Sequence, residues 1–159
     1  KFHWDAKIIG YSLGAMGLLG AIVQGGLIRL IIPKIGQKRG VYIGLFLYSI
    51  GFVLFAFAAE TWMMFAFMVP YILGGIAGPS LQGLISTQVP ANEQGELQGA
   101  MTSLMSLTSI IGPPLMSNLF YFFTKPTAPF YFPGAPMLTA AVLTLISAFL
   151  ARKSLRKNF

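Results

Sequence analysis

The chain has 159 residues, of which 55% are hydrophobic and only 9% are charged, and its formal net charge is +7. Soluble domains carry about 25% charged residues, so a chain this poor in charge cannot cover a water-facing surface, and lipid is its natural solvent. The basic residues flank apolar stretches and form no stripe interleaved with aromatic residues, which argues against a nucleic-acid partner. Cysteine is absent, which excludes disulfides, thiol catalysis and cysteine metal sites.

Five apolar stretches follow one another along the chain, each long enough to cross a bilayer. A spanning helix needs about 20 apolar residues. Barrel strands would alternate polar and apolar residues in stretches of about 10, whereas these runs are continuously apolar. The predicted spans cover residues 8–32, 41–59, 62–87, 97–123 and 131–151. Pro133 and Pro136 leave the start of the fifth span at either Tyr131 or Met137. We expect an all-α transmembrane domain over residues 1–159.

The distribution of positive charge predicts how these spans are oriented. In a five-span path, the turn at 33–40 and the C-terminus share one side. That side collects eight basic residues, Arg29, Lys34, Lys38, Arg39, Arg152, Lys153, Arg156 and Lys157, against Lys1, Lys7 and Lys125 on the other. The bias predicts a cytoplasmic C-terminus. The chain also opens without Met, as an excerpt of a longer polypeptide would, and a cytoplasmic native N-terminus would require an odd number of upstream spans.

Small residues recur at helical spacing on three of the spans. Helices in lipid associate through close packing, which small residues permit. The stripes are Gly10, Gly14, Gly17, Ala21 and Gly25 on the first span; Gly75, Gly78, Gln82 and Ser86 on the third; and Gly99, Ser103, Ser106, Ile110, Pro113 and Ser117 on the fourth. Each stripe is a packing seam, a cavity lining, or both.

Proline follows glycine at two places inside these spans, Gly78-Pro79 and Gly112-Pro113. Proline removes a backbone donor and kinks or breaks a helix. At membrane depth such a break needs protein or a water-filled cavity to satisfy the freed carbonyls. We expect these sites to shape the gates of a carrier; the alternative is a fixed bend in a static bundle.

Uncharged polar side chains are the candidate ligand contacts. Gln24 in the first span and Gln82 in the third carry amides that need partners in lipid, and a cavity or a ligand could supply them. Ser106 and Asn118 extend this polar set along the fourth span. The alternative is that these groups bond to one another across helices.

Groups for chemistry are missing from the predicted spans. Their middle holds no Asp, Glu, Lys, Arg or His, and a proton-coupled carrier normally needs an ionisable group there. The sequence also lacks paired carboxylates at depth, a Ser/His/Asp set, a Walker loop and a cluster of metal ligands. We expect neither an enzyme nor a cofactor.

Three segments carry a resemblance to a known family. The stretch from Gly74 to Gly83 (GGIAGPSLQG) resembles the tenth helix of the tetracycline/proton antiporters, a branch of the major facilitator superfamily. Residues 93–99 (EQGELQG) and 106–113 (SLTSIIGP) are similar to the loop and helix that follow in that family. Residues 9–24, ending in Gln24, resemble its eighth helix.

This resemblance implies that the five spans are helices eight to twelve of a twelve-helix carrier with two six-helix halves around a central cavity. The chain departs from the family at two positions: Gly20 stands where a His is typical, and Tyr48 stands where a proton-coupling Asp is typical. Proton coupling would then use acids in the other half.

The leading expectation is a secondary efflux carrier for a small amphipathic organic solute or drug, working by proton antiport in a bacterial inner membrane. Its partners would be the bilayer, the substrate and the N-terminal half of the same carrier. The alternatives are a non-transporting membrane subunit or regulator on a carrier-like scaffold, and an importer of the same fold.

Overall fold

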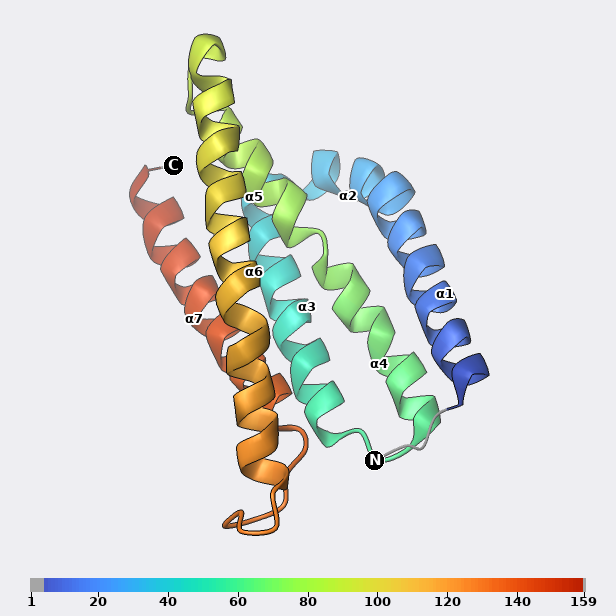
Figure 1. The fold of residues 1–159 in the computed structure, drawn as a ribbon. Coiled ribbons are helices and arrows are strands. Elements are labelled where there is room, and N and C mark those ends of the chain that lie inside the picture. Colours follow the sequence, from blue (N-terminus) through green and yellow to red (C-terminus); the bar gives the residue numbers. More distant parts are fainter. Residues whose placement is uncertain (1–4, 159) are drawn as a thin grey trace.

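The computed structural model describes residues 5–158, and every regular element in that part of the chain is helical (Figure 1). The elements are α1 (Ala6–Ile22), the π-helical turn η1 (Val23–Leu27), α2 (Ile28–Ile35), α3 (Gln37–Phe57), α4 (Thr61–Gly74), α5 (Ala77–Ser86), the 3-10 turn η2 (Ala91–Glu93), α6 (Gln94–Thr124) and α7 (Ala135–Asn158). The five predicted spans thus correspond to α1–η1–α2, α3, α4–α5, α6 and α7.

Four helical segments in the described part are long and apolar enough to cross a membrane: Ala6–Ile35, Gln37–Phe57, Thr61–Ser86 and Ala135–Arg156. The helix α6 is not one of them, although it is the longest, with 31 residues. Its first turns carry Glu96 and several amides, and hydroxyl residues interrupt the rest. The fifth span begins at Ala135, because the chain before it folds back, with the Phe132 amide bonded to the Phe123 carbonyl at 3.0 Å.

Successive helices run between the same two ends of the bundle (Figure 1). One end holds the α2–α3 turn, the α5–α6 connection and the C-terminus, and the other holds the α3–α4 turn and the α6–α7 loop. We call the first the inner end, because the predicted basic cluster gathers there. Lys1, counted on the opposite side, lies outside the described residues.

The central helix of the bundle is α3, which packs against α4, α5 and α7. Glycines make these contacts possible. A Cβ at Gly44 would lie 2.5 Å from the Ala77 amide nitrogen, and one at Gly51 would lie 2.9 Å from the Tyr71 Cα. At Gly40 an added Cβ would meet the hydroxyl of Ser80. The α3 backbone therefore lies directly against its neighbours, as small residues allow between membrane helices.

The first helical segment packs on α4 through one face only. Val23 and Ile28 are buried there in one cluster with Met68, Ile72 and Ile76. The predicted stripe of small residues, represented by Gly10, Gly14 and Gly17, points elsewhere, and a Cβ at any of these three glycines would have no atom of the described chain within 4 Å. The stripe is therefore an open face.

Gly36 makes the turn between α2 and α3 with φ +82° and ψ 152°. This region is essentially restricted to glycine and costs other residues about 1–3 kcal/mol. Space is not the obstacle, since a Cβ here has nothing within 4 Å. We expect Gly36→Ala to lower the thermal stability of the detergent-purified carrier, whereas Gly26→Ala, in an equally open but helical position, should change it less. Equal melting temperatures for the two variants would contradict the backbone argument.

Candidate functional site

A seam of amide side chains joins α5 to α6. The Nε2 of Gln82 donates to the Oε1 of Gln98 at 3.3 Å, and both side chains are exposed. Gln94 fixes the start of α6, because its amide donates to the carbonyls of Ser86 and Val89 at 2.8 Å each. These carbonyls lie at and just beyond the end of α5, where backbone acceptors lack helical partners. Gln94 thus holds the two helices in register and brings Gln82 to Gln98.

The position of this seam along the spans decides which side can reach it. About 20 helical residues cross the hydrocarbon core. Counted from the outer ends, at Thr61 and at Thr124, these 20 residues reach about Ser80 in the third span and about Met105 in α6. Gln82 and Gln98 therefore lie just beyond these 20 residues, at a level that we call the inner boundary of the spans, and both side chains are exposed there.

The other predicted contacts are not gathered at this seam. Gln24 lies in the π-helical turn η1 with its side chain exposed, and no hydrogen bond joins it to Gln82 within residues 5–158. Ser106 and Asn118 are exposed on α6. The Asn118 amide donates to the Pro114 carbonyl of its own helix at 2.8 Å. Of the predicted contacts, Gln82 alone bonds across helices in the described part of the chain, to Gln98. The alternative of bonding across helices is therefore supported at Gln82 and not at Gln24, Ser106 or Asn118.

The two Gly-Pro sites differ. In the third span the helix is interrupted at Gly75–Ile76, between α4 and α5, and Pro79 lies in the first turn of α5. The Tyr48 ring lies against this interruption, since a Cβ at Gly74 would be 2.7 Å from its Cγ. Pro79 has no backbone N–H to donate. In the first turn of a helix this costs no hydrogen bond, because the N–H groups there have no acceptor within the helix.

At Gly112-Pro113 the sequence predicts a kink or a break, and the structure shows no break there. The helix α6 continues through Pro113 and Pro114 to Thr124 without interruption. Proline is tolerated in membrane helices where the freed carbonyls find other partners. The structure therefore places the interruption in the third span and none in the fourth.

An apolar cavity of about 250 Å³ lies between α1, α3 and α4, and sequence reasoning did not predict it. Its lining combines rings and thioethers: Ser12, Met16, Phe52, Phe55, Met64, Met68, Tyr71 and Met137. The Tyr71 ring meets Phe52 and Phe55 edge-on, with centroids 5.3 and 5.7 Å apart. Flexible methionines beside fixed rings suit apolar ligands of varied shape. The sequence signal that could have indicated this cavity is the spacing of Phe52, Phe55 and the methionines along the helices.

No group of three or more His, Cys, Asp or Glu side chains that could hold a metal ion occurs in the described residues. What the site offers is neutral: amides at the inner boundary, hydroxyls along α6, and an apolar cavity nearer the outer end. Such a set can bind and release an uncharged or amphipathic molecule by hydrogen bonds and apolar contact.

Comparison with known proteins agrees with this arrangement. The family model described as Major Facilitator Superfamily matches residues 1–158. The tetracycline resistance protein, class C, of Escherichia coli is 38% identical over 120 residues, which cover 76% of this chain and 30% of the relative. The class G protein of Vibrio anguillarum is 39% identical over 113 residues, covering 71% and 29%.

A human relative, Hippocampus abundant transcript-like protein 1, is 25% identical over 171 residues, which cover 94% of this chain and 34% of the relative. No solved structure is significantly similar to the chain. The chain spans about a third of the length of the curated relatives it matches. It belongs to the Major Facilitator Superfamily, in its tetracycline-resistance-like branch.

Proposed function

We propose that the chain is part of a secondary active transporter that exports a small amphipathic organic solute or drug. The observation that carries this proposal is the amide seam of Gln82 and Gln98, exposed at the inner boundary of the spans. A solute arriving from the cytoplasm would meet hydrogen-bonding groups there first, then the hydroxyl-bearing face of α6. The relatives named for tetracycline resistance support export as the direction.

We further propose that the carrier is completed by a second half that covers the open faces of this chain. The 31 residues of α6 include no buried residue, and the glycine stripe of α1 is open. These are the faces that helices in lipid use to associate. This supports the assignment of the chain to the C-terminal half of a twelve-helix carrier in the bacterial inner membrane, with its C-terminus in the cytoplasm.

Energy coupling is proposed to be proton antiport, with the titrating acids contributed by the other half. The positions at which the family carries His and Asp hold Gly20 and Tyr48 here. The described spans offer uncharged groups for the substrate, and a proton site would therefore be separate from them.

Transport by the complete carrier in inside-out vesicles tests the proposed substrate contact. We expect Gln82→Ala to lower the transport rate at low substrate concentration by about three- to tenfold, the effect of one lost hydrogen bond. Gln88→Ala, which removes the same amide at the exposed end of α5, is the control. Equal rates for the two variants would remove Gln82 from the site.

The same vesicles separate the alternatives. Accumulation that needs an inward-acidic gradient supports antiport, and accumulation without a gradient argues for another coupling. Net movement only in the opposite direction would indicate an importer. A complete carrier that moves no organic solute would favour the non-transporting subunit.

A further inference from the structure

Two cavities adjoin at the inner end of α3 and α7. The first, of about 550 Å³, is lined by Phe149, Arg152, Lys153 and Arg156. The second, of about 520 Å³, is lined by Tyr42, Ile43, Phe46, Ala148, Phe149 and Arg152. Phe149 and Arg152 belong to both linings, so the two form one open groove, whose basic part lies along α7 alone and whose apolar part lies between α3 and α7.

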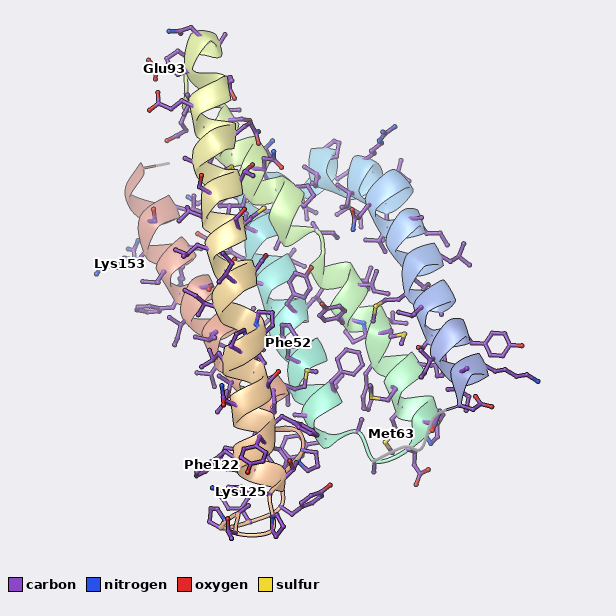
Figure 2. All side chains as sticks on the ribbon, viewed as in Figure 1. Phe52, Met63, Glu93, Phe122, Lys125 and Lys153 are labelled. Carbon is purple, nitrogen blue, oxygen red and sulfur yellow. The ribbon has the colours of Figure 1, made fainter. Side chains whose placement is uncertain are left out.

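The groove is built on a firm seam between the two helices. Val41 of α3 and Leu155 of α7 are buried together with Leu84, and Ala151 packs against this cluster. The groove lies outside this seam, where Phe46 is 59% exposed and Phe149 is 68% exposed. Lys153 points away from the bundle on the same helix (Figure 2). Large apolar rings and cations thus share one accessible surface.

The basic and apolar parts of the groove follow one another along α7 and α3 in the same order as the phosphate and the hydrocarbon of a phospholipid. Along α7, the direction from Arg156 to Phe149 leads from the inner end of the bundle toward its opposite end (Figure 1). On α3, the same direction leads from Tyr42 to Phe46. Counted from Ala135, about 20 residues of α7 reach Ser154. Arg156 therefore lies at headgroup level, Arg152 and Lys153 lie within one turn of it, and Phe149 lies deeper, beside the acyl chains. A phospholipid has the same sequence of phosphate and hydrocarbon.

The charge of the groove favours an anionic occupant. Neither lining contains an acidic residue. Of the four acidic residues of the chain, Asp5 and Glu60 lie at the outer end, and Glu93 and Glu96 lie at the inner start of α6, where Figure 2 labels Glu93. Basic pockets between membrane helices on the cytoplasmic side bind the headgroups of anionic lipids.

We propose that this groove is a binding site for an anionic phospholipid of the inner leaflet. The phosphate contacts Arg152, Lys153 and Arg156, and one acyl chain lies across Phe149, Phe46 and Ile43. A free phosphate or nucleotide would use only the basic part. The apolar half of the groove is what selects a lipid, and the site is independent of the transported solute.

The test is lipid binding to the complete detergent-purified carrier, measured by native mass spectrometry during titration with phosphatidylglycerol or phosphatidylcholine. The triple variant Arg152→Gln/Lys153→Gln/Arg156→Gln should weaken phosphatidylglycerol binding by about tenfold or more. The control triple, Lys34→Gln/Lys38→Gln/Arg39→Gln, removes the same charge at the same end outside the groove and should weaken binding less than threefold.

A second variant tests the apolar half without changing charge. Phe46→Ala should weaken phosphatidylglycerol binding about threefold or more through lost apolar contact. Inorganic phosphate should fail to displace the lipid at millimolar concentration. Equal losses in the two triple variants, equal binding of both lipids, displacement by phosphate, or no effect of Phe46→Ala would each overturn the proposal. So would a groove covered by the rest of the carrier, which would leave every variant with wild-type binding.

Discussion

Gly44→Ala is expected to destabilise the bundle strongly, because α3 lies directly against α5 at this glycine. The added Cβ would lie 2.5 Å from the Ala77 nitrogen, 2.7 Å from its Cβ and 2.8 Å from its Cα. Two of these three atoms are backbone, so no side-chain rotation can relieve the overlap, and α3 must move away from α5. Overpacking of this kind costs about 1–3 kcal/mol. Thermal unfolding of the complete carrier in detergent measures it as a lowered melting temperature.

A matched pair of variants gives this prediction its control. Gly95→Ala places the same methyl group on α6, where nothing lies within 4 Å, and should leave the melting temperature near that of the wild type. Adding Ala77→Gly to Gly44→Ala removes only the Cβ of the three overlapping atoms, so stability should recover in part. A Gly44→Ala protein as stable as Gly95→Ala would show that α3 and α5 do not approach this closely.

Gly14→Leu is expected to lower transport by the complete carrier about tenfold or more, because it would place a branched side chain on the open glycine stripe of α1. Within the described chain the new side chain meets no atom at its Cβ, so this bundle can accept it. A second half packed on the stripe cannot, since close helix approach in lipid depends on small residues. Transport in vesicles and the amount of folded carrier in the membrane are the two measurements.

Ile22→Phe adds bulk to the flank of the same helix, about 80° around it from Gly14, where Ile22 is 55% exposed, and should leave transport near the wild-type rate. If both substitutions are equally harmless, the stripe faces lipid and the proposed partner lies elsewhere. A loss of folded protein in both would instead indicate that α1 is sensitive to bulk on every side.

Much of the helical architecture could be read from the apolar runs. The helix bounds agree with the predicted stretches to within a few residues for the first four, because a helix in lipid must satisfy its backbone internally along its whole apolar length. The last helix starts at Ala135, between the two predicted starts, because Pro133 and Gly134 belong to a turn. It continues to Asn158, beyond the predicted end at Ala151.

Contacts between helices were harder to predict, because small residues at helical spacing mark close packing and open faces equally. The stripe through Gly10, Gly14 and Gly17 is open, whereas the contacts the structure uses are made by Gly40, Gly44 and Gly51 on α3. Similarly, proline marks a missing donor but not whether the helix is interrupted. Pro79 follows an interruption, and Pro113 does not cause one.

The pairing of Gln82 with Gln98 could not be predicted either, because it depends on the turn that Gln94 closes. Gln82 itself was found from its chemistry, as an amide inside an apolar span that needs hydrogen-bond partners. Its partner was not, since Gln98 falls in a polar stretch where amides are ordinary.

The π-helical turn η1 determines where the first span can lose one residue without disturbing its packing. Its characteristic bond runs from the Ile28 amide to the Val23 carbonyl, five residues back rather than four. This turn thus holds one residue more than an α-helical turn. Losing one residue here would tighten it to a regular turn and keep Ser12 and Ile28 on their packed faces. The same deletion within α1 would rotate everything on one side of it by about 100°, so η1 is where this span tolerates a shorter sequence.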